Sequence, residues 1–201
     1  MLFSDEYKEP SAPAEATLRE RGSRFLAFAY PVQNEATLKN LLQSVKLQFP
    51  DATHHCYAVV MHPDKSYQRS NDDGEPSNTA GRPILRMILS KDLTNVLVVV
   101  VRYFGGTQLG IPGLIKAYGD AAKAALDGME IQLSYIEDYC TLCTDFSREQ
   151  DIHRLVGRFQ ARLIERNYDL EVCCRLAVKR SQFPALLQAL TDFPGIRHIK
   201  Q

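Results

Sequence analysis

One apolar run constrains the fold of this chain more than any other feature. The run NVLVVVV, residues 95–101, is unbroken and rich in β-branched side chains, which is typical of a strand covered on both faces. Such a strand belongs in the middle of a sheet. Its C-terminal end carries Arg102, Tyr103 and Phe104, and a glycine-rich turn follows at residues 105–113. Because an amphipathic helix is predicted to begin near Pro112, this turn is expected to expose backbone amides.

An acidic loop lies upstream of this strand, in the segment DDGEPSNTAGRP at residues 72–83. A helix is predicted over residues 79–89, with Ser77 or Thr79 as its N-cap and with Arg82 and Arg86 on its outward face. The polar segment at residues 63–78 has no periodicity. This absence predicts a mobile surface loop that is a candidate binding element.

The segments DGEPSNTAGRPIL and VVVVRYFGGTQLGIPGLIKAYGDAA resemble the signature of the IMPACT family in its two-domain bacterial form. The family pattern reads DGEPSGTAG, then RYFGG, then LG, a variable residue and GGL, then RAY. The chain departs from this pattern at Asn78, Pro112 and Lys116. The first two replace glycines, and Asn78 can still adopt a positive φ whereas Pro112 cannot. The turn geometry at Pro112 is therefore open.

The strand and helix patterns predict an α+β protein with domains at residues 1–136 and 137–201, in which residues 1–13 are flexible. A hairpin is expected from residues 15–19 and 25–32. The second domain reads βαββαβ, a ferredoxin-like order, with Ser147 capping its first helix. The family resemblance implies that the first domain has a left-handed βαβ crossover similar to a ribosomal-protein and elongation-factor domain. It also implies that the second resembles a late domain of elongation factor G.

Composition and charge restrict how this chain could bind nucleic acid, and its apolar pattern argues against a membrane or secreted protein. The 201 residues are 45% hydrophobic and 24% charged, and the formal net charge is zero, so nucleic acid could be bound only through a local basic patch. No apolar stretch is long enough to span a bilayer, and the first residues lack a secretory signal. A cytoplasmic protein without a membrane partner is expected. The oligomeric state is left open.

The cysteines suggest a metal site only weakly. Cys140 and Cys143 have metal-like spacing, and Cys173 and Cys174 are expected on a strand that could be their neighbour. Residues one or three apart on a strand face opposite sides, so four thiolates could not easily meet. Neither a metal nor any other cofactor is predicted. A reducing cytoplasm also makes a disulfide unexpected.

A first functional hypothesis is anion binding at the glycine-rich turn. Free amides and the helix dipole favour negative charge at a helix start, although the glycines could equally serve only the sharp turn. The candidate anion or nucleic-acid contacts are Arg24, Arg82, Arg102, Tyr103, Gly105, Gly106 and Lys116. The resemblance contributes Arg24, because the family also has a Ser-Arg-Phe near this place.

A second hypothesis is catalysis. Asp72, Asp73 and Glu75 could hold Mg²⁺ for phosphoryl transfer or hydrolysis, with His54 or His55 as a base. Adjacent strand histidines point in opposite directions, so a metal site built from both is improbable. No nucleophile elbow, Walker loop or zincin motif is present, and the chain is predicted not to be primarily an enzyme.

A third hypothesis is a binding module, and the resemblance favours it. In eukaryotes, IMPACT proteins are associated with control of translation through partner binding. The resemblance therefore implies a translation-linked regulatory protein that engages the ribosome, its RNA or a translation-associated protein. The expected contact surface is the cleft around the acidic loop and the glycine-rich turn.

Overall fold

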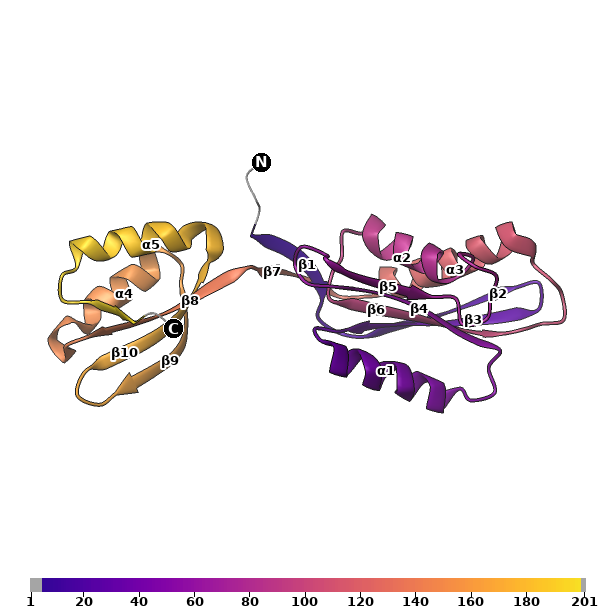
Figure 1. Ribbon diagram of the computed structural model, residues 1–201, viewed down its shortest axis with the longest axis horizontal. Helices are drawn as coiled ribbons and strands as arrows, with labels where there is room; N and C mark the ends of the chain where they lie inside the picture. Colours follow the sequence, from indigo (N-terminus) through magenta and orange to yellow (C-terminus); the bar gives the residue numbers. More distant parts are fainter. Residues whose placement is uncertain (1–4, 200–201) are drawn as a thin grey trace. The chain divides into compact units, whose positions relative to one another are not determined.

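The computed structural model describes residues 5–199 of the chain. The chain divides into two compact units (Figure 1). Residues 7–134 form the N-terminal unit, and residues 135–199 together with residues 5–6 form the C-terminal unit. Each unit combines helices with an antiparallel sheet, which confirms the predicted α+β class. Within residues 5–199, no helix is both long and apolar enough to cross a membrane.

The N-terminal unit is built on a five-stranded sheet. Its strands are β2 (Ala14–Glu20), β3 (Ser23–Pro31), β4 (His54–Met61), β5 (Tyr67–Asn71) and β6 (Val96–Tyr103), and its helices are α1 (Glu35–Gln48), α2 (Gly81–Ser90) and α3 (Gly110–Asp127). The strand order is β2-β3-β6-β4-β5, and all neighbours are antiparallel. The predicted hairpin of β2 and β3 is confirmed. Strands β3 and β4 run parallel to each other on the two sides of β6, and α1 joins them. This β3-α1-β4 segment is the predicted βαβ unit. The handedness of its crossover stays a prediction.

Strand β6 is covered on both faces, as its apolar run predicts. Its even-numbered valines, from Val96 to Val100, pack in the core formed with α2 and α3. Its odd-numbered residues, from Leu97 to Val101, pack in the core formed with α1, on the other face of the sheet (Figure 1). The alternation continues to the end of the strand. Arg102 therefore points to the α2/α3 side, and Tyr103 points to the α1 side.

The N-terminal segment is ordered, so the prediction of a flexible stretch is wrong for residues 5–13; residues 1–4 lie outside the described part. Residues Glu6–Pro10 form β1, which pairs with β7 (Ile131–Tyr135) in a two-stranded sheet. Glu9 is buried and accepts a hydrogen bond of 2.6 Å from the Asn95 amide and another from Ser134. This buried polar contact fixes the position of β1, although the polar composition of the segment is typical of a flexible tail.

The polar segment at residues 63–78 is also more ordered than predicted. Its residues 67–71 form the edge strand β5, which pairs with β4. Gly81, the first residue of α2, lies against the end of this strand. A Cβ at Gly81 would come within 2.8 Å of the Asn71 backbone nitrogen, so only glycine permits this close approach.

The C-terminal unit has the predicted ferredoxin-like order. Its elements are β8 (Glu137–Thr144), α4 (Glu149–Arg158), β9 (Arg162–Tyr168), β10 (Val172–Lys179), α5 (Phe183–Ala189) and β11 (Arg197–Ile199). The sheet order is β11-β8-β10-β9, and both helices contribute to the core on one face of it. The predicted Ser147 cap is not formed. A 3₁₀ turn at Phe146–Arg148 precedes α4 instead, and none of the described side chains caps this helix.

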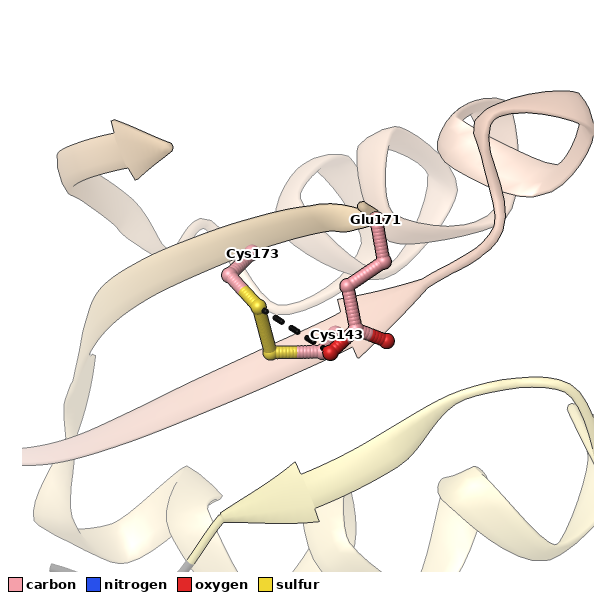
Figure 2. A group of neighbouring side chains, drawn as sticks. All are labelled: Cys143, Glu171 and Cys173. Atoms are coloured by element: carbon pink, nitrogen blue, oxygen red, sulfur yellow. Dashed lines mark hydrogen bonds between the residues drawn. A yellow bond between two sulfur atoms is a disulfide. The ribbon is translucent and has the colours of Figure 1, made fainter. Parts of the chain in front are cut away.

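The cysteines of this unit separate into two pairs. Cys143 and Cys173 lie opposite each other in the register of β8 and β10 and form a disulfide with an S–S distance of 2.03 Å (Figure 2). The prediction that no disulfide forms is therefore wrong. Cys140 and Cys174 belong to the core beneath the helices. The four sulfur atoms do not converge, as the alternation of strand residues predicts.

Candidate functional site

The acidic loop is anchored by Asp72, which caps helix α2. Its Oδ1 accepts hydrogen bonds from the amides of Ala80 and Gly81 at 3.0 and 2.8 Å, and its Oδ2 accepts one from the amide of Asn78 at 2.9 Å. The prediction that Ser77 or Thr79 caps this helix is therefore wrong. A carboxylate eight residues upstream of Ala80 satisfies the free amides instead, and its negative charge suits the helix dipole.

Asp73 and the two adjacent histidines tie the loop to β4. The Asp73 carboxylate accepts a 2.7 Å hydrogen bond from the backbone amide of His55, and the carbonyl oxygen of Asp73 lies 2.7 Å from His54 Nδ1. Because a carbonyl can only accept, His54 Nδ1 carries a proton. The ring of His55 contacts the Phe49 carbonyl at 2.9 Å. The two histidines point in different directions, as predicted, and His54 is the one that faces Glu75, at 3.8 Å.

Glu75 and Arg102 form a buried ion pair beneath α3. Arg102 Nη1 lies 2.5 Å from Glu75 Oε1, and both side chains are almost completely buried. The same carboxylate oxygen accepts a 2.8 Å hydrogen bond from the Tyr118 hydroxyl. Burial raises the pKa of that hydroxyl well above its ordinary value, so Tyr118 remains a donor. Arg102 Nη2 donates to Ser23 Oγ at 3.3 Å.

These contacts do not support the proposed Mg²⁺ site. The three carboxylates of the acidic loop engage different partners: Asp72 binds helix amides, Asp73 binds β4 and Glu75 binds Arg102. Within residues 5–199, the loop contains no set of three close ligand atoms. The catalytic candidates His54, His55, Asp73 and Glu75 therefore lie near one another, and each has a hydrogen-bond partner within the fold.

The glycine-rich turn packs against the β2–β3 hairpin. A Cβ added to Gly105 would lie 1.9 Å from the carbonyl carbon of Gly22, so the two backbones touch there and only glycine fits. The Gly105 amide also donates to Ser23 Oγ at 3.2 Å. Gly106 has a φ of +84°, and no described atom lies within 4 Å of the position that a Cβ would take there. Gly110 likewise has a positive φ, of +69°. The turn thus has one glycine required by packing and two required by backbone conformation.

The backbone accommodates both residues that replace glycines of the family pattern, Asn78 and Pro112. Asn78 adopts a φ of +66°, which an asparagine tolerates better than most residues. Pro112 lies in the first turn of α3, where its fixed φ and missing amide cost little. The positive φ of +69° that this helix start requires falls on Gly110 and not on Pro112.

A pocket of about 330 Å³ lies at the start of α3. Arg102 and Glu75 contribute its charged part, and the rest is formed by Pro76, Phe104, Gln108, Leu109, Gly110, Ile111 and Leu114. Phe104 and Ile111 are large apolar side chains that are 49% and 59% exposed. No side chain among residues 5–199 caps α3, so its first amides are not satisfied by a capping group. The site combines an exposed apolar rim with a buried, paired charge.

The predicted cationic contacts are dispersed. Lys116 pairs with Asp120 at 2.6 Å on the outer face of α3. Arg24 stacks over the Tyr103 ring at 4.6 Å, and the Tyr103 hydroxyl donates to Asp51 at 2.9 Å. Arg82 is exposed on α2. Of the predicted anion contacts with a charge, only Arg102 lines the pocket, and Glu75 neutralises it.

Several residues of the site were not predicted from the sequence. Ser23 accepts a hydrogen bond from Arg102, and Tyr118 donates one to Glu75. Phe104 and Ile111 form the exposed apolar rim. The only sequence signal for them was position: Phe104 follows the buried strand directly, and Ile111 immediately precedes Pro112, near which the helix was predicted to start.

Residues 21–126 match the family described as the Impact N-terminal domain. The IMPACT family member YigZ of Escherichia coli strain K12 is 33% identical over 92% of this chain and 91% of its own. One solved structure, of a hypothetical protein, is 30% identical with a TM-score of 0.71 and covers 99% of this chain and 98% of that chain. Another, described as the two-domain translational regulator Yih1, is 31% identical with a TM-score of 0.38, over 63% of this chain and 48% of that chain.

Proposed function

Since this chain belongs to the IMPACT family, we propose that it is a translation-linked regulatory protein that works by binding a partner. The contact site is the pocket at the start of α3, between the acidic loop and the glycine-rich turn. The link to translation rests on what the family resemblance implies. The choice of a binding role over catalysis rests on the hydrogen-bonded acidic loop, whose carboxylates are each occupied by the fold.

The observation that carries the proposal is the exposed apolar rim. Phe104 and Ile111 flank a pocket large enough for an apolar side chain of a partner. Exposed aromatic and aliphatic residues beside a pocket are typical anchors of protein–protein contacts. Because the charge inside the pocket is paired, a neutral or weakly polar group fits it better than a phosphate. A translation-associated protein is therefore the favoured partner.

Ribosomal RNA is a second candidate, and one contact favours it. The Arg24 guanidinium lies over the Tyr103 ring at 4.6 Å, and Arg24 is exposed. An exposed arginine on an aromatic ring is a platform on which an unpaired base can stack. With a net charge of zero, the protein would neutralise few phosphates, so RNA binding would depend only shallowly on salt.

Affinity capture from a lysate, with and without nuclease, separates these two partners. The informative variant is Ile111→Asp, which places a charge on the rim without removing a core contact. The matched control is Leu47→Asp, because Leu47 is 72% exposed on α1 and does not line the pocket. We expect wild type and Leu47→Asp to capture the same translation components, resistant to nuclease, and Ile111→Asp to lose them. Capture that is abolished by nuclease and by Arg24→Glu would favour RNA, and capture unaffected by either variant would contradict the site.

A further inference from the structure

We propose that the C-terminal unit contains a redox-gated zinc site formed by Cys143, Cys173 and Glu171. One candidate ligand atom from each side chain lies within 4.8 Å of the others. Figure 2 shows the two sulfur atoms joined as a disulfide and the Glu171 carboxylate directed toward them. In the reduced protein the same three groups would hold the ion. This site lies in the C-terminal unit and is independent of the binding role proposed above.

Strand register brings the three groups together. Cys143 on β8 and Cys173 on β10 are directly paired, with Cα atoms 4.1 Å apart. Glu171 immediately precedes β10, and its Oε1 lies 3.8 Å from Cys173 Sγ. The ladder fixes these positions whether or not the sulfurs are bonded. Cys140 and Cys174 are packed in the core, so they do not compete for the ion.

The ligand chemistry suits zinc better than magnesium or calcium. Two thiolates and one carboxylate are ligands that Zn²⁺ accepts, whereas the hard cations prefer oxygen alone. Three protein ligands leave one tetrahedral position for water. An open pocket of about 240 Å³ adjoins Cys173 and is bordered by Thr141, Glu165, Asn167 and Arg175. Water can therefore reach the ion from this side of the sheet.

Arg197 holds the Glu171 carboxylate in place through both of its oxygen atoms. It lies opposite Cys143 in the register of β11 and β8. A hydrogen-bonded partner that orients a ligating carboxylate is a regular feature of zinc sites. Two thiolates and a carboxylate carry three negative charges, so the positive charge of Arg197 and the two charges of Zn²⁺ balance them.

The change between the disulfide form and the zinc-bound form conserves electrons and protons. A dithiol reductant supplies two electrons and two protons to the Cys143–Cys173 disulfide, which breaks the S–S bond and leaves two thiols, while the reductant closes its own disulfide. Zn²⁺ then binds both sulfurs and releases the two thiol protons. In the reverse direction the two sulfurs take up two protons from solvent as Zn²⁺ leaves, and a disulfide oxidant then accepts two electrons and two protons as the Cys143–Cys173 bond forms. The site thus binds zinc only in the reduced protein.

The test is a Co²⁺ titration of the full chain, reduced with a phosphine and kept without oxygen, followed by displacement with Zn²⁺. We expect one equivalent of Co²⁺ to give thiolate-to-cobalt absorption in the reduced protein and none in the oxidised protein. Cys143→Ser and Cys173→Ser should each abolish the band, and Glu171→Gln should weaken Co²⁺ binding by at least about tenfold. The matched control is Cys174→Ala, which removes a neighbouring thiol from the core and should keep the band.

Several outcomes would overturn the site. These are no thiolate absorption in the reduced wild type, the loss of the band in Cys174→Ala while that variant keeps the wild-type circular dichroism, or undiminished binding by Glu171→Gln. If a serine variant fails to fold, alkylation of the reduced wild type supplies the same information. Bound Zn²⁺ should then protect Cys143 and Cys173 from the reagent, and equal labelling with and without Zn²⁺ would contradict the proposal.

Discussion

Arg102 and Glu75 are 27 residues apart in the sequence and meet as a buried ion pair, with Nη1 and Oε1 separated by 2.5 Å. The pair joins the two motifs that identify the family, because Glu75 belongs to the acidic loop and Arg102 lies near the end of the strand before the glycine-rich turn. It also closes the inner side of the pocket at the start of α3. The pair therefore sets the position of both walls of the proposed binding site.

Removing one member of this pair should destabilise the protein strongly. Arg102→Met leaves the Glu75 carboxylate buried without its cation, and a buried charge without a partner typically costs about 3 to 5 kcal/mol. We expect a loss of this size in the free energy of unfolding, measured by urea denaturation. The double variant Arg102→Met with Glu75→Leu should recover most of it, because the pair is then replaced by apolar groups. Lys116→Ala is the control, because its ion pair with Asp120 is exposed to solvent and should change the stability little.

Gly105→Ala should be far more damaging than Gly119→Ala. The added methyl group at Gly105 would overlap the Gly22 backbone, at 1.9 Å, whereas Gly119 lies in α3 with no described atom within 4 Å of its Cβ position. We expect Gly105→Ala to cost about 1 to 3 kcal/mol or more through forced backbone shifts. Gly119→Ala should be neutral or stabilise by up to about 1 kcal/mol, because alanine favours helix. Thermal unfolding of both variants gives the comparison, and equal effects would contradict the close packing of the turn.

Reducing the Cys143–Cys173 disulfide should lower the stability of the C-terminal unit. The bridge closes a loop of 30 residues, for which loop-closure entropy gives about 3 to 4 kcal/mol. Guanidinium unfolding of the metal-free chain with and without a reductant measures the change. The double variant Cys143→Ala with Cys173→Ala should be insensitive to the reductant. A wild-type curve that does not respond to reduction would show that the bridge does not form.

We also propose that the two units unfold separately, with the boundary near residues 135–137. The division of the chain falls there, and a single residue, Ile136, separates β7 from β8. Amide exchange monitored residue by residue should then give one midpoint for residues 7–134 and another for residues 137–199. Disulfide reduction should move only the second midpoint. A single midpoint for all residues would contradict two independent units.

Asp127 should titrate well below an ordinary aspartate. Hydrogen bonds from Lys123 and Lys91 lower its pKa from 3.8 to about 2. Because the folded value lies below the unfolded one, this contribution to stability is present above about pH 4 and is lost as the pH falls toward 2. Carboxyl NMR titration measures the folded pKa directly. Since the group is exposed, added salt should move the pKa back toward its ordinary value, and no effect of salt would contradict the assigned cause.

Sequence patterns within single strands and helices correctly predicted those elements and the faces on which their side chains lie. The β-branched run at residues 95–101 identified a strand covered on both faces, and the apolar periodicity of the second domain identified its βαββαβ order. The alternation of adjacent strand residues correctly placed His54 and His55 in different directions. In each case the signal lies within one element, so a single sequence is sufficient.

The errors arose where a distant partner decides the structure. β1 is polar and has little intrinsic strand character, but Glu9 is satisfied by Asn95, 86 residues away. The Asp72 cap reaches a helix whose own first residues offered plausible alternatives. The disulfide depends on the register of β8 and β10, which no local pattern specifies. Arg102 was expected to be free for an anion, and only the folded chain shows that Glu75 occupies it.

The alternation of side chains along β6 limits which mutations in this strand the fold can tolerate during evolution. Every residue of β6 up to Val101 serves one of two separate cores, and Arg102 meets Glu75 only because it falls on the α2/α3 side. One inserted residue would exchange the two faces from that point onward. It would direct the guanidinium of Arg102 into the apolar layer beneath α1 and the ring of Tyr103 toward Glu75. β6 should therefore accept apolar substitutions during evolution while keeping its length unchanged.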